Sequence, residues 1–210
     1  MASSHEREYT LITRLVHMLI AIAVIVQLAT SLVMNAHPQD GSEDVFFEVH
    51  EYSGLISFAV ICAFWVIILF RQRGTTLSEL FPWFSVRRRK ELIDAVKARL
   101  RNTDKTGRLS FYDGDPLAKA VHGLGIAIIS VMAMTGLTYF VALKLGAGEG
   151  ILASTAMLIH EPVSKLAWAY LVAHAGIAVF HALLKERALS VMWSLKADTI
   201  DPESHSNELD

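Results

Sequence analysis

The chain has 210 residues, of which 53% are hydrophobic and 19% are charged, and its formal net charge is −2. A soluble domain carries about 25% charged residues and interrupts its apolar runs with polar ones, so this composition argues against a soluble protein. The single cysteine, Cys62, lies inside an apolar run, which excludes both a disulfide framework and a cluster of thiolate metal ligands.

Four apolar runs without a charged residue follow one another along the chain. They are Leu15–Met34, Tyr52–Phe70, Ala120–Leu143 and Leu166–Leu184. A helix needs about 20 such residues to cross about 30 Å of hydrocarbon, and the runs lack the alternation of barrel strands. The sequence therefore predicts an all-α membrane protein with a four-transmembrane-helix bundle.

The helices are expected over about residues 11–34, 50–70, 117–143 and 160–185. They would form one membrane domain over residues 1–193, followed by a polar tail over residues 194–210. The apolar core of the first run is longer than the 7–15 residues of a typical signal peptide. We therefore expect the first helix to be retained.

Basic residues are concentrated in one connection. Twelve of the 19 Lys and Arg residues lie between Arg71 and Lys119, between the second and third helices. The first connection, residues 35–51, has none and carries five carboxylates. By the positive-inside rule, the long middle connection and both termini face the cytoplasm. The acidic first connection and the glycine-rich third one face the other side.

The middle connection holds an amphipathic pattern. FPWF at residues 81–84 is typical of an aromatic anchor at the headgroup level. The following basic stretch predicts a helix whose apolar residues share one side: Val86, Leu92, Ile93, Val96 and Leu100. This helix either lies on the anionic cytoplasmic leaflet or packs on the cytoplasmic ends of the bundle. Beside four membrane spans, we expect no nucleic-acid role for it.

Six histidines lie in the predicted helices or at their mouths: His17, His50, His122, His160, His174 and His181. One histidine at membrane depth can simply hydrogen-bond a neighbouring helix, but ionisable groups there are functional candidates by default, and six of them strengthen that reading. His17 and His122 belong to the cytoplasmic side, and His50 and His160 to the outer side. His174 follows His160 by 14 residues, which is about 21 Å along a helix, so it returns to the inner level.

The last three histidines share one stripe of their helix, because His174 lies about 40° around the axis from His160 and His181 about 20° further. His50 and His160 therefore share an outer level, and His17 and His174 an inner one. Two opposed imidazoles are the axial ligands of a six-coordinate haem iron, so two levels predict two haems. Zinc, which takes three or four converging ligands, is the alternative; the outer level also offers Glu51 and Glu161.

Three segments resemble the bacterial cytochrome b561 superfamily, whose members include the cytochrome b subunits of nickel–iron hydrogenase and respiratory formate dehydrogenase. The segments are RLVH at residues 14–17, HEYSG at 50–54 and HEPVSKLAWAYLVAHAGIAVFH at 160–181, and the resemblance covers about residues 9–190. It implies two b-type haems, with His50 and His160 on the outer iron and His17 and His174 on the inner one. This is the pairing that the depth argument indicates.

The resemblance also implies a quinone site near the inner haem, of which His181 would be a member. His122 is left without an iron. It could contact a haem propionate, take part in quinone protonation or replace His17 as the inner ligand.

Together these patterns predict transmembrane electron transfer in the bacterial inner membrane, between a periplasmic-side redox partner and the quinone pool. The chain would be the membrane subunit of a respiratory oxidoreductase, with a hydrogenase, a dehydrogenase or a cytochrome c as partner. One alternative is a stand-alone superoxide:quinone oxidoreductase, which the acidic outer connections disfavour because they would repel a small anion. Another is haem-free proton or metal-ion translocation by the histidines, which the lack of broken helices or inverted repeats disfavours.

Overall fold

The structure is a computed structural model that describes residues 11–35, 44–70, 75–106 and 115–183. Its four long helices are α1 (Leu11–Ser31), α2 (Val45–Phe70), α5 (Pro116–Lys144) and α6 (Ile151–Leu183). Each is long and apolar enough to cross a membrane, and the described residues contain no strand. The prediction of an all-α protein with four membrane spans is confirmed. The tail predicted over residues 194–210 lies outside the described residues.

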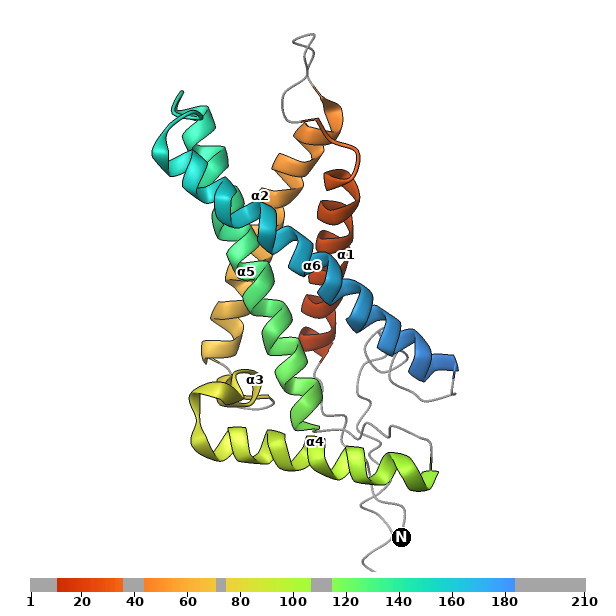
Figure 1. Cartoon of the computed structure of the whole chain (residues 1–210). Coiled ribbons are helices and arrows are strands. Elements are labelled where there is room, and N and C mark those ends of the chain that lie inside the picture. The colour runs from red at the N-terminus through yellow and green to blue at the C-terminus, as the bar shows by residue number, and fades with distance from the viewer. Residues whose placement is uncertain (1–10, 36–43, 71–74, 107–114, 184–210) are drawn as a thin grey trace, which may run out of the picture.

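The long helices pack in a chain of neighbours, with α1 against α2, α2 against α5 and α5 against α6. Helix α6 crosses the other three obliquely rather than running beside them (Figure 1). Two small apolar clusters join the helices, one around Ile20, Ile61 and Ile126 and the other around Leu28, Ile128 and Ala167. Of the four spans, α6 has the smallest buried share, so it offers the most surface to lipid.

Two helices begin several residues earlier than predicted. Helix α6 starts at Ile151 rather than near residue 160, and Pro162 lies inside it. Residues 151–159 are largely apolar, and a helix satisfies their backbone groups without water. Helix α2 starts at Val45 because Asp44 caps it, accepting hydrogen bonds from the amides of Phe46 (2.8 Å) and Phe47 (3.2 Å). His50 and His160 therefore lie within their helices rather than at the first residues.

The connection between α2 and α5 contains α3 (Leu77–Leu80), the 3₁₀ turn η1 (Pro82–Phe84) and α4 (Val86–Thr106). The amphipathic helix predicted in this connection is therefore present. It lies across the end of the molecule at which α2 ends and α5 begins, roughly perpendicular to the long helices (Figure 1). It contacts η1 and α5, and Phe81 stacks on Trp65 of α2 with ring centres 5.9 Å apart.

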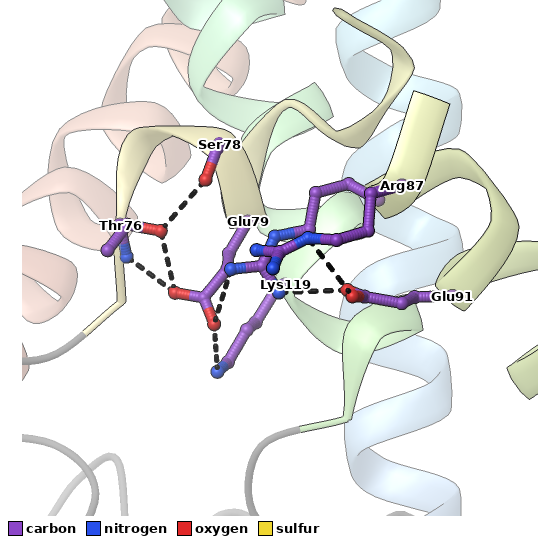
Figure 2. A network of polar contacts seen from close by, with 7 residues as sticks. Thr76, Ser78, Glu79, Arg87, Glu91 and Lys119 are labelled. Carbon is purple, nitrogen blue, oxygen red and sulfur yellow. Dashed lines mark hydrogen bonds and ion pairs between the residues drawn. The ribbon is translucent and has the colours of Figure 1, made fainter. Parts of the chain in front are cut away.

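Glu79 holds this connection to α5 through a polar network (Figure 2). Its carboxylate accepts hydrogen bonds from the amide (2.7 Å) and hydroxyl (2.9 Å) of Thr76, and it pairs with Lys119 of α5 at 3.3 Å. Arg88 of α4 lies 3.8 Å from the same carboxylate and donates a 2.8 Å bond to Glu91. Burial alone would raise the pKa of Glu79, but the bonds from Thr76 and Lys119 outweigh it and lower the pKa.

Candidate metal centres

The outer pair brings α2 and α6 together. The ring centres of His50 and His160 lie 6.4 Å apart, and their planes are nearly perpendicular at 83°. An imidazole nitrogen lies about 2 Å from a bound metal ion and about 1 Å from its own ring centre, so two rings on opposite sides of one ion have centres about 6 Å apart. The outer pair therefore has the spacing of two axial ligands.

Hydrogen bonding assigns the free nitrogen of His160. Its Nδ1 lies 2.8 Å from the Thr135 hydroxyl, and that hydroxyl is also within hydrogen-bond distance of the backbone carbonyls of Val131 (2.8 Å) and Met132 (3.1 Å). When the hydroxyl donates to either carbonyl of its own helix it can only accept from His160, which places the imidazole proton on Nδ1. Nε2 is left with its lone pair, which is the state required of a metal ligand.

His50 is held in the same way from α1. Its Nδ1 lies 3.0 Å from the Thr30 hydroxyl and 3.2 Å from the carbonyl oxygen of Gln27. The Thr30 hydroxyl donates to the Val26 carbonyl at 2.8 Å, so it too accepts from the histidine. Both outer imidazoles thus have Nδ1 protonated and Nε2 available. Sequence analysis did not find Thr30 or Thr135, because no spacing rule links a hydroxyl to a histidine on another helix.

A cavity of about 670 Å³ encloses the outer pair, with lining residues from all four long helices. This volume falls within the range of about 300–1,000 Å³ seen for small-molecule and cofactor pockets. Gly136 leaves room beside His160, since a Cβ there would lie 3.4 Å from Cε1 of this histidine. The lining and the paired Nε2 atoms fit a flat group held by one central metal.

The outer mouth of the cavity is acidic, with Glu51, Glu149 and Glu161 in its lining. The side chain of Glu51 is 9% exposed and pairs with Lys144 at 3.6 Å, whereas that of Glu161 is 73% exposed and pairs with Lys165. In the described part of the chain, the outer histidines do not converge with a third metal-ligating residue. The geometry therefore gives no support to zinc at this level.

The inner level holds three histidines rather than two. His17 of α1, His122 of α5 and His174 of α6 place one ligating atom each within 4.8 Å of the others. The ring centres of His17 and His174 are 6.4 Å apart, which repeats the spacing of the outer pair. His122 lies 5.1 Å from His174 and 5.9 Å from His17. His17 with His174 and His17 with His122 both come close to the spacing of two ligands of one ion, so the ring distances alone do not choose between the two pairs.

The surroundings of the inner cluster orient its rings. Nδ1 of His122 lies 2.8 Å from the Ala118 carbonyl, so this nitrogen is the protonated one. Nδ1 of His17 is buried and finds no hydrogen-bond partner among the described residues. Tyr170 stacks on His174 with ring centres 5.4 Å apart and donates to the Val121 carbonyl at 3.2 Å.

Arg14 is a residue that sequence analysis missed at the inner level. It lies one turn before His17 and is 0% exposed. The only feature of the sequence that could have indicated a role for Arg14 is its position in the RLVH segment, three residues before His17. His181, by contrast, belongs to α6, but its side chain lies outside the described part of the structure.

Apolar helices that carry half-buried histidine pairs at two levels are typical of the membrane cytochromes b. The family model of prokaryotic cytochrome b561 matches residues 8–195. The chain therefore belongs to the prokaryotic cytochrome b561 family, and it is a multi-pass bacterial membrane protein of haem b electron transport. No curated protein and no solved structure matches it.

Proposed function

We propose that the chain carries electrons across the bacterial inner membrane through two b-type haems, between a periplasmic-side redox partner and the quinone pool. It would act as the membrane subunit of a respiratory oxidoreductase, with both termini in the cytoplasm. The observation that carries the proposal is the repeated spacing of 6.4 Å in two histidine pairs at opposite levels of the same four helices.

The chain's own residues would hold and orient each group. His50 and His160 would ligate the outer iron, and His17 and His174 the inner one. Thr30 and Thr135 keep the outer imidazoles in the tautomer that ligates. Haem b supplies a one-electron redox centre, and the low-polarity lining of the cavity sets its potential through burial and hydrogen bonding.

The quinone would bind at the inner end of the molecule. His122 lies beside the proposed inner pair, 5.9 Å from His17 and 5.1 Å from His174, and would be free for this role when His17 and His174 hold the iron. His181 lies seven residues beyond His174 on α6. Quinone reduction needs protons, and histidine is suited to deliver them near neutral pH. The external partner would be a hydrogenase, a dehydrogenase or a cytochrome c docked at the acidic outer mouth.

The test is a reduced-minus-oxidised spectrum of the purified chain with a haem count by pyridine haemochrome. Two haems per chain are expected, and His50→Ala and His174→Ala should each lose one. His205→Ala, in the C-terminal tail, is the matched control and should keep both. Two haems retained in either ligand variant would contradict the pairing.

The inner cluster favours a second candidate function, a site for a bare metal ion, because three histidines converge there as zinc ligands do. Elemental analysis of the same preparation separates the two. The chain would be purified from cells supplied with ample haem. If it then contains no haem but one zinc ion per chain, the first proposal is wrong and haem-free ion chemistry replaces it.

A further inference from the structure

Helix α4 exposes a narrow apolar stripe. Val86, Ile93 and Leu100 are 75%, 50% and 69% exposed. They are spaced seven residues apart, so each lies only about 20° around the axis from the one before. Three large apolar side chains therefore form one continuous line along four turns of a helix that is otherwise strongly polar.

The side of α4 next to the stripe is fixed to the rest of the molecule; on it, Leu92 and Val96 lie about 100° and 60° around the axis from Ile93. Arg88 lies about 140° around the axis from Ile93, and it reaches Glu79 at 3.8 Å. Leu92 and Val96 are half-buried. These contacts fix the rotation of α4 about its own axis. The apolar stripe is therefore held on the exposed surface of the helix.

Basic side chains border the stripe on both sides. On a wheel of 100° per residue, Arg89 lies about 40° from Ile93 on one side, and Lys97, Lys90 and Arg101 lie about 40–80° from it on the other. All four are exposed. An apolar line bordered by long cationic side chains is the pattern of a helix lying in a membrane interface, where Lys and Arg extend toward the phosphates.

The position of α4 agrees with such a surface. It lies across the end of the four spans, roughly perpendicular to them (Figure 1). Immediately before it, Phe84 is 85% exposed and Trp83 is 37% exposed, and aromatic residues of this kind are enriched at the headgroup level. A soluble partner protein would not require the stripe, the aromatic residues and the ends of the spans to share one level.

We propose that α4 docks on the anionic phospholipids of the protein's own membrane. The docking face consists of Val86, Arg89, Lys90, Ile93, Lys97, Leu100 and Arg101. The apolar stripe would enter the headgroup–acyl boundary, and the basic residues would contact lipid phosphates. This inference is independent of the haems.

Depth-dependent quenching tests the proposal in the full-length chain. Cys62→Ser removes the only native thiol, after which Ile93→Cys places a fluorescent label on the stripe. Ala98→Cys is the matched control, because Ala98 is also exposed but lies about 140° around the helix from Ile93. Both labelled chains are reconstituted in nanodiscs that contain a nitroxide lipid labelled near the headgroup.

In nanodiscs rich in phosphatidylglycerol, the label at 93 should be quenched several-fold more than the label at 98. Quenching at 93 should fall in pure phosphatidylcholine, and also after Lys90→Gln, Lys97→Gln and Arg101→Gln together, since each basic residue contributes about a fivefold preference for an anionic surface. Equal quenching at 93 and 98, or quenching at 93 that does not depend on lipid charge, would overturn the proposal. Weak quenching at both positions would instead favour a soluble partner.

Discussion

Two threonine hydroxyls decide which nitrogen of each outer histidine faces the cavity. Thr30 and Thr135 both donate to a carbonyl of their own helix, and therefore accept from Nδ1 of His50 and His160. Partners of this kind fix the tautomer and the ring orientation of a ligand. Single hydroxyls on α1 and α5 thus control the chemistry of side chains on α2 and α6.

We expect Thr135→Val to weaken haem binding at the outer site about tenfold or more, as loss of such a partner typically does. Valine keeps the shape of threonine but cannot accept the proton of His160 Nδ1. The measurement is a haemin titration of the purified chain, followed by its absorbance. Thr138→Val on the same helix is the control, because this hydroxyl bonds the Met134 carbonyl. An unchanged affinity in Thr135→Val would show that packing alone orients His160.

At the scale of helices, close approach between α3 and α5 depends on one glycine. A Cβ at Gly123 would overlap the carbonyl oxygen of Leu80 and lie 2.6 Å from its carbonyl carbon. Both atoms belong to the backbone, so no side chain can move aside to make room. Packing of α3 against α5 therefore requires a residue without a side chain at position 123.

Gly123→Ala should destabilise the chain by about 1–3 kcal/mol, the usual cost of overpacking. Gly176→Ala is the matched control in another span, because a Cβ there meets nothing within 4 Å. That substitution should leave the stability unchanged or raise it by up to about 1 kcal/mol through helix propensity. Thermal unfolding in detergent, compared between the two variants, checks both. A similar Tm for both variants would contradict the packing argument.

The network around Glu79 makes the stability of the α3–α5 contact depend on pH. The pKa of Glu79 is lowered in the folded protein from its ordinary value of 4.5, so its contribution is present above that value and is lost as the pH falls through the folded pKa. Glu79→Gln should lower the stability by about 1 kcal/mol at pH 7, and the difference from the parent should shrink in acid. Glu91→Gln, at a more exposed pair, should have a smaller effect. The check is Tm against pH for all three chains; a constant difference would argue against an ionised Glu79.

The sequence predicted the helices well where the length and hydropathy of a segment determine them. It predicted them less well where contacts with neighbouring helices determine the structure. The four spans follow from apolar runs, because lipid leaves the backbone few alternatives. The start of α6 did not follow, because Glu161 and Pro162 resemble a helix beginning although Pro162 lies inside the helix. His122 was left unpaired for a related reason. Spacing along one helix gives a depth, but not which helices face each other.

At the scale of the whole molecule, the inner end is basic and the outer end acidic. Helix α4 lies at the end where α2 finishes and α5 begins, and 12 of the 19 basic residues belong to the stretch from Arg71 to Lys119. The outer mouth carries Glu51, Glu149 and Glu161. Since positive residues remain in the cytoplasm during insertion, this asymmetry predicts one orientation.

A fluorescent-protein fusion at the C-terminus should therefore fluoresce, and an alkaline phosphatase fusion in the connection at residue 147 should be active. The first reporter folds only in the cytoplasm and the second only outside it. Fusions in the reverse arrangement serve as controls and should be silent. The opposite pattern would contradict the proposed orientation, because it would place the acidic end of the molecule in the cytoplasm.

Helix α6 carries one ligand of each proposed pair, His160 and His174. The number of residues between them therefore fixes the distance between the two centres. Fourteen residues set a separation of about 21 Å, and one inserted residue would turn one ligand by about 100° relative to the other. An insertion of about four residues would bring the two ligands back to a common face, but it would move the centres about 6 Å further apart. The connections between helices can therefore vary in length without changing the conducting path, whereas these 14 residues cannot.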